Sequence, residues 1–91
     1  MIMYREGELA KSKSGHDKDK IYVIVREERE YVYLVDGKYR TIDKPKRKNK
    51  KHIQMIHNGD SVVGEKIRNH KLVDDVEIRA EIKKASKLLE L

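Results

Sequence analysis

A dense block of lysine and arginine side chains in the middle of the chain offers the clearest chemistry of this sequence. Residues 38–57 carry eight Lys or Arg residues and a single acid, Asp43, so this segment has a formal charge of +7. The whole chain is +6, which leaves −1 for all other residues together. So many like charges repel one another unless a polyanion neutralises them. The segment from Lys44 to Lys51 is therefore predicted to be a phosphate-binding loop, and the alternative is a solubility device or a disordered hinge.

The histidines raise a second possibility, metal binding or catalysis. No two of them are three or four positions apart, the chain has no cysteine, and no His-Glu-x-x-His motif is present. His16 and Asp17 resemble a general base and its orienting carboxylate, but no nucleophile or phosphate-cradling glycine loop accompanies them. We therefore expect no metal, no cofactor and no enzymatic activity. The four histidines are His16, His52, His57 and His70.

Length and composition limit the scaffold that can position these residues. Ninety-one residues without an internal repeat predict one small domain, or a small domain with an appendage. The longest apolar run, Ile21 to Val25, is far too short to cross a bilayer, and the first residues do not have the pattern of a secretory signal. The absence of cysteine fits a reducing compartment. We expect a cytoplasmic protein that does not enter a membrane.

Alternating apolar residues and turn signals predict five short strands before residue 58. We place them at residues 7–14, 21–26, 31–36, 38–42 and 51–56, with the basic loop between the last two. Asp36-Gly37 is a strong hairpin dipeptide, and Gly15 suits a turn with positive φ. Such spacing is typical of a small barrel or sandwich. The side chains expected inside are Leu9, Ile21, Val23, Val25, Val32 and Leu34.

After residue 58 the pattern becomes helical. Ser61–Asn69 is predicted to form a short helix, and Asp74 with Glu77 has the spacing of a capping box that opens a second helix. An apolar stripe follows on the second helix at helical spacing. We expect it to pack on the strands or on the preceding helix, or else to form a docking face for a partner or a second copy. The stripe consists of Ile78, Ile82, Ala85 and Leu89.

Three stretches together resemble a known family. Residues 9–24, Leu-Ala-Lys-Ser-Lys-Ser-Gly-His-Asp-Lys-Asp-Lys-Ile-Tyr-Val-Ile, resemble a KOW motif, with the family's loop glycine at Gly15. Val-Asp-Gly-Lys-Tyr-Arg at 35–40 and Lys-Pro-Lys-Arg-Lys-Asn-Lys-Lys-His at 44–52 resemble the small bacterial KOW-domain RNA-binding proteins. These are kin to a group of archaeal and eukaryotic large-subunit ribosomal proteins. The chain departs from the family at Asp19, where members usually carry a second glycine, although Asp tolerates positive φ better than most residues.

The resemblance implies a mainly β fold with an α tail, in which a small SH3-like five-stranded barrel occupies residues 1–57 and a helical appendage residues 58–91. It also implies RNA binding, associated with the ribosome or ribosomal RNA, and leaves a ribosome or protein partner open for the C-terminal helix. Because the sequence shows no exposed aromatic platform, we expect the contacts to be with the backbone and shape of structured RNA. The candidate RNA-binding residues are Lys11, Lys13, His16, Lys18, Lys20, Lys38, Arg40, Lys44, Lys46, Arg47, Lys48, Lys50, Lys51 and His52.

Two other functions stay open on the sequence. SH3-like barrels also bind polypeptides, so a protein-interaction module of the transcription or translation machinery is the alternative. Charge alone does not separate RNA from DNA either. A variant that neutralises residues 46, 47, 48 and 50 together is expected to weaken RNA binding and to leave folding nearly untouched, because the block is expected to be a solvated loop.

Overall fold

A computed structural model describes residues 5–56 and 61–88 of the chain. These residues fold into five β-strands and two α-helices. The strands are β1 (Leu9–Ser12), β2 (Ile21–Glu28), β3 (Tyr31–Val35), β4 (Lys46–Asn49) and β5 (Ile53–Ile56). A 3₁₀ turn, η1 (Lys50–His52), joins β4 to β5. The helices are α1 (Val62–Arg68) and α2 (Asp75–Leu88). The expected mainly β fold with a helical C-terminal segment is confirmed.

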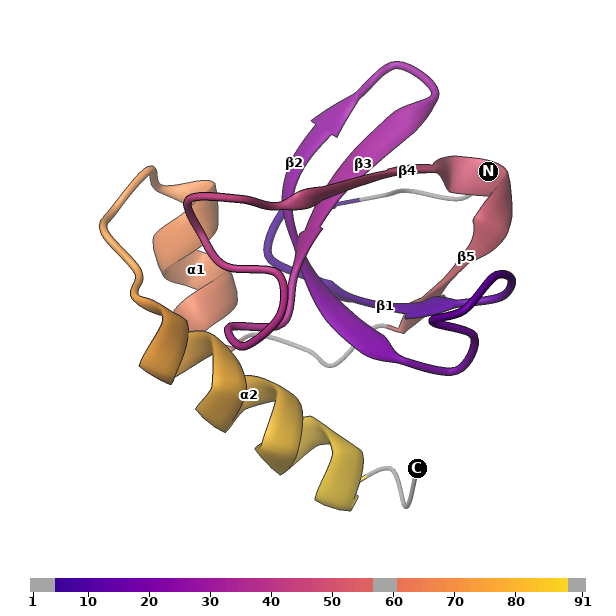
Figure 1. Cartoon of the computed structure of the whole chain (residues 1–91). Helices are drawn as coiled ribbons and strands as arrows, with labels where there is room; N and C mark the ends of the chain where they lie inside the picture. Colours follow the sequence, from indigo (N-terminus) through magenta and orange to yellow (C-terminus); the bar gives the residue numbers. More distant parts are fainter. Residues whose placement is uncertain (1–4, 57–60, 89–91) are drawn as a thin grey trace.

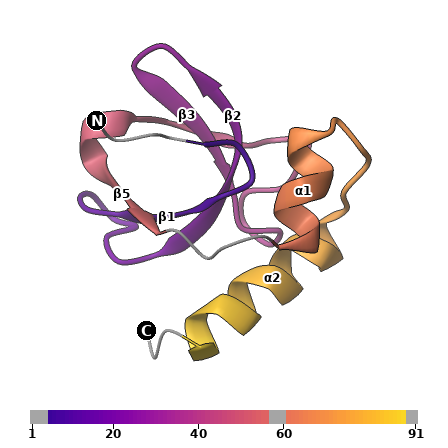
Figure 2. The same ribbon diagram turned by 180° about the vertical axis from the view of Figure 1, so that it is seen from behind.

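The strands form one antiparallel sheet in the order β4-β3-β2-β1-β5. The sheet curls around a concave side, and both helices lie together on its other side (Figures 1 and 2). β4 and β5 end the order, and within the described residues no ladder joins them. The expectation of a closed barrel is therefore wrong in this respect: the sheet stays open between β4 and β5, and η1 bridges its two edges.

Both faces of the sheet carry apolar side chains, which is why the first five residues of the central strand β2 are apolar without alternation. On the helix side, Leu9 and Val35 are the cross-strand partners of Val23, and all three are fully buried beneath the helices. On the concave side, neighbouring strands contribute a second buried cluster: Ala10, Tyr22, Ile24, Val32, Leu34 and Ile53. We expected a single interior, whereas the sheet has one buried cluster on each face. Of the side chains expected inside, Ile21 and Val25 are only partly buried. The register shifts between Ile24 and Arg26, next to Val25.

The two helices begin and pack as their sequences predict. The Ser61 side chain caps α1 by accepting a hydrogen bond from the Gly64 N–H. The Asp74 carboxylate accepts from the Glu77 N–H at 2.8 Å, which confirms the cap of α2. Ile78 and Ala85 of the stripe are buried against the helix side of the sheet, with Ile82 partly buried beside them. The stripe therefore packs within the chain over the residues described; Leu89 lies outside them.

The path after β3 differs from the expected hairpin. Residues 38–42 do not form the return strand, because Asp36 Oδ1 accepts hydrogen bonds from three successive backbone N–H groups, those of residues 38, 39 and 40. These donors are thus engaged by a side chain rather than by a neighbouring strand. The return strand is β4, which lies inside the basic block. Across residues 5–56 and 61–88, the structure has no helix with the length and apolar character that a membrane crossing needs.

Candidate nucleic-acid interface

The middle of the basic block is an edge strand, and its alternation divides the cations between two faces. Lys46 pairs with Leu34 and Lys48 with Val32 across the β3–β4 ladder. Because directly opposed residues of an antiparallel pair lie on the same face, both lysines lie on the concave side. Arg47 lies on the other face, exposed, with its guanidinium 4.6 Å from the centre of the Tyr31 ring. The prediction of a solvated loop over residues 44–51 is therefore wrong for β4.

A buried carboxylate receives the two inward lysines. The ammonium groups of Lys46 and Lys48 each lie 2.8 Å from an oxygen of Asp17, whose side chain is only 8% exposed. Ser12 and Tyr22 donate their hydroxyls to the same carboxylate, each at 2.9 Å. Asp17 comes from the loop between β1 and β2, so it ties that loop to the opposite edge of the sheet.

The pKa values of this cluster follow from its geometry. Burial alone would raise the pKa of the Asp17 carboxyl, but hydrogen bonds from Lys46, Lys48, Ser12 and Tyr22 outweigh burial and hold it well below its ordinary value. Burial, together with the hydrogen bond to Asp17 and its negative charge, raises the pKa of Tyr22 well above its ordinary value. The cluster therefore holds an ionised carboxylate and a protonated phenol over the whole physiological range.

His16 does not join Asp17 in a catalytic pair. Its side chain is exposed, and the Asp17 oxygens are taken up by the donors just named. Over the described part of the chain, no three His, Cys, Asp or Glu side chains are grouped closely enough to hold a metal ion. His57 lies outside that part.

The remaining candidate residues fall into two groups. Lys11 is half-buried and 3.7 Å from Asp19, Lys50 pairs with Glu27, and His52 is half-buried in η1. The other candidates are exposed on the loop before β2, the loop after β3, the outer face of β4, or η1. They are Lys13, His16, Lys18, Lys20, Lys38, Arg40, Lys44, Arg47 and Lys51.

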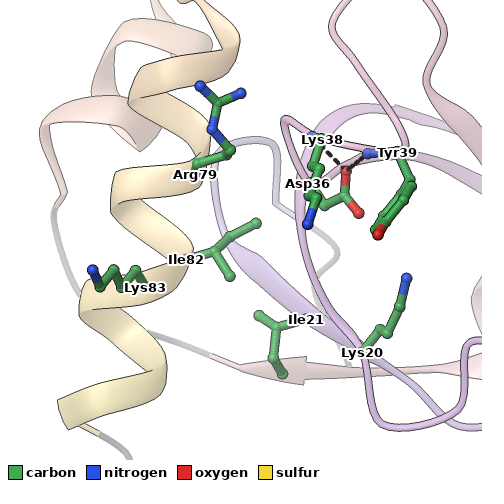
Figure 3. Close-up of a pocket in the computed structure, with 8 residues that line it drawn as sticks. All are labelled: Lys20, Ile21, Asp36, Lys38, Tyr39, Arg79, Ile82 and Lys83. Carbon is green, nitrogen blue, oxygen red and sulfur yellow. Dashed lines mark hydrogen bonds between the residues drawn. The ribbon is translucent and has the colours of Figure 1, made fainter.

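The loop before β2 (residues 13–20) and the loop after β3 (residues 36–45), together called the two long loops, meet at Tyr39. Sequence reasoning did not single out this side chain. The Lys20 ammonium lies 4.7 Å and the Lys38 ammonium 5.0 Å from the centre of the Tyr39 ring, and this tyrosine is 69% exposed. Figure 3 shows the ring between the loop after β3 and the start of β2, across a pocket from α2. No exposed aromatic side chain was identified from the sequence, and Tyr39 was missed because residues 38–42 were placed in a strand, whereas they form a loop.

Helix α2 supplies the far wall of this pocket. Arg79, Ile82 and Lys83 line it, and Arg79 donates a hydrogen bond to the backbone oxygen of Gly37. Only Gly fits at 37, because its φ is +78° and an added Cβ would lie 2.4 Å from the Asp75 backbone oxygen. The loop after β3 is thus fastened to α2 at close range. Spacing along the sequence gave no signal for this contact, which joins residues about forty positions apart.

Comparison with known protein-family models and with curated proteins gives no match for this chain.

Proposed function

We propose that this protein binds structured RNA through phosphate contacts made by its two long loops and the outer face of β4. The observation that carries the proposal is the charge left exposed after the internal pairs are formed. Residues 13–20 and 36–52 present eight exposed Lys or Arg side chains and only two exposed acids, Asp19 and Asp43. Each cation that neutralises a phosphate releases a counterion, so such a surface favours a polyanion.

The resemblance of residues 7–57 to KOW-domain RNA-binding proteins supports RNA over DNA, and ribosomal RNA or the ribosome as the setting. The backbone angles of two loop residues fit this resemblance. Gly15 has φ +85°, and Asp19, at the position of the family's second glycine, has φ +73°. Positive φ is costly for most residues, so an aspartate there preserves the turn that a glycine would give.

A protein partner that docks on the apolar stripe of α2 is less well supported. Ile78 is fully buried and Ala85 is 4% exposed against the sheet, so this part of the stripe is already covered. A partner could still reach the outer side of α2, where Val76 is 62% exposed. We therefore place RNA on the loops and assign no partner to the helix.

The direct test is binding of the purified chain to a labelled hairpin from a large-subunit ribosomal RNA, with a DNA hairpin of matched sequence as control. We expect tighter binding to RNA and an affinity that falls linearly with the logarithm of salt concentration. Cosedimentation with ribosomal subunits at increasing salt tests the setting. Equal affinity for both hairpins would overturn the choice of RNA, and binding to neither would overturn the proposal.

A further inference from the structure

The pocket between the loop after β3 and helix α2 combines features that suit a single nucleotide. Its volume is about 300 Å³, at the small end of the range for ligand sites. Ile21 from β2 and Ile82 from α2 form its apolar part (Figure 3). The remaining lining residues are one exposed aromatic ring, four cations and one carboxylate: Tyr39, Lys20, Lys38, Arg79, Lys83 and Asp36.

The Tyr39 ring is available for stacking. It is 69% exposed, and its described neighbours over the ring are the ammonium groups of Lys20 and Lys38. Exposed cation–π contacts change an equilibrium constant by about two- to fivefold, whereas stacking of a base on an aromatic side chain is worth about 5- to 140-fold. A base can therefore displace a lysine from the ring, and the flexible lysine remains close enough to pair with the phosphate.

The charged groups that line the pocket divide into those already held by the protein and those free to bind a ligand. Arg79 is held by Gly37, and Asp36 Oδ1 is occupied by three backbone N–H groups. Lys20 and Lys38 make no salt bridge within the described residues, so their ammonium groups are free to meet an anion. The Lys83 ammonium is directed away from the pocket (Figure 3).

The second oxygen of Asp36 gives the pocket a hydrogen-bond acceptor. Over residues 5–56 and 61–88 it accepts from no donor, and in Figure 3 it is directed toward the Tyr39 side of the pocket. A carboxylate oxygen only accepts hydrogen bonds. Where the exocyclic group at position 4 of a pyrimidine reaches this oxygen, it therefore favours cytosine, which presents an amino group there, over uracil, which presents a carbonyl oxygen.

We infer that this pocket receives one unpaired nucleotide of an RNA strand, with the base stacked on Tyr39 and the adjacent phosphate held by Lys20 and Lys38. This inference rests on the proposed RNA binding and adds base recognition to it. It replaces the expectation of purely backbone and shape recognition, which depended on there being no exposed aromatic platform.

The test compares three RNA hairpins that share one stem: fully paired, with a single bulged cytidine, and with a single bulged uridine. Each is titrated against the wild-type chain, Tyr39→Ala and Tyr39→Phe, with cytidine monophosphate as the free-nucleotide probe. The wild-type chain should bind the cytidine bulge at least about fivefold more tightly than the paired stem and more tightly than the uridine bulge. Tyr39→Ala should lose that gain and keep its affinity for the paired stem, and Tyr39→Phe should retain both. Unchanged thermal unfolding of both variants excludes a folding defect, as expected for an exposed side chain.

Other results separate the inference from the proposed function. If the wild-type chain binds all three hairpins equally and Tyr39→Ala changes nothing, the pocket inference is overturned and RNA binding stands. If no hairpin binds, both fall together. Equal affinity for the two bulges overturns the role of Asp36. If cytidine monophosphate binds as tightly as the bulged hairpin, with amide shifts at residues 20, 38, 39 and 82, the pocket belongs to a free nucleotide and the assignment to an RNA strand is overturned.

Discussion

The Lys48 ammonium lies 2.8 Å from Oδ1 of Asp17, and only 10% of the lysine side chain and 8% of the aspartate side chain are exposed. This ion pair joins the loop after β1 to β4, which carries the densest charge in the sequence. The same ammonium also donates to the Ser12 hydroxyl and the Ser14 backbone oxygen. Part of what looks like a binding surface in the sequence is therefore the polar part of the protein's interior.

The first prediction concerns the carboxylate of this pair. Asp17→Asn should lower the free energy of unfolding by about 3–5 kcal/mol, because the Lys48 ammonium, on a side chain only 10% exposed, and the half-buried Lys46 ammonium lose their counter-charge. Asp19→Asn is the matched control two residues away. Asp19 is 68% exposed and 3.7 Å from Lys11, so its loss should cost less than about 1 kcal/mol. Urea unfolding measures both, and equal costs would show that the buried cluster contributes little to stability.

The second prediction is a pH dependence with two limbs. In the unfolded chain the Asp17 carboxyl takes up its proton near pH 4, but in the folded chain its pKa is lowered, so stability should fall as the pH drops below about 5. The raised pKa of Tyr22 has the opposite effect. The unfolded phenol loses its proton first, near pH 10, so stability should fall as the pH rises above that value.

Urea titrations across the pH range test this prediction, with the Asp17→Asn variant as reference. The variant should have a flatter acid limb, and its Tyr22 should titrate at lower pH because the neighbouring negative charge is gone. An unchanged acid limb would mean that other carboxyl groups produce it.

The third prediction separates two adjacent cations of β4. Lys48→Gln should be destabilising toward the lower end of about 3–5 kcal/mol, since Lys46 remains to pair with Asp17. Arg47→Gln should cost less than about 1 kcal/mol, because it removes only an exposed contact with Tyr31. In RNA-binding assays on folded protein, Arg47→Gln should weaken binding. The reverse ranking of stabilities would contradict the assignment of faces along β4.

The fourth prediction concerns Gly37, in the loop after β3 that contacts α2. Gly15, in the loop before β2, is the control. Gly15→Ala should cost about 1–2 kcal/mol, because Gly15 has positive φ but an added Cβ would have its nearest neighbour 3.6 Å away. Gly37→Ala should cost more, since the same strain is joined by a clash with the Asp75 backbone oxygen. An equal decrease in unfolding temperature for the two variants would indicate that the loop can move away from the helix at little energetic cost.

Local signals in the sequence were sufficient for most elements of the fold. Apolar runs indicated β2 and β3, and the Asp74–Glu77 capping box marked the start of α2, because these features depend on neighbouring residues. The return strand was misplaced because Asp36-Gly37 predicts a tight hairpin, whereas the carboxylate of Asp36 binds three amides and lengthens the loop. β4 was missed because a strand of charged residues lacks an apolar alternation.

The candidate site was predictable in composition but not in arrangement. The basic segments are evident from charge counting, yet only the three-dimensional register shows that Lys46 and Lys48 face inward while Arg47 faces outward. Asp17 was considered only beside His16, since nothing near it in sequence indicates two lysines about thirty positions away. The pocket at Tyr39 depends on α2 in the same way.

The central claim is that exposed loop cations hold RNA phosphates, and the salt dependence of affinity tests it most directly. Lys18, Arg40 and Lys44 are exposed and, within the described residues, make no side-chain hydrogen bond or ion pair. The variant Lys18→Gln/Arg40→Gln/Lys44→Gln should fold normally, bind structured RNA more weakly, and lose about 2–3 units from the slope of log affinity against log salt. A control with the same charge loss on the helical segment, Lys71→Gln/Lys84→Gln/Lys87→Gln, should keep the wild-type slope. If the loop variant keeps the wild-type affinity and slope, the loops do not bind phosphate and the account is wrong.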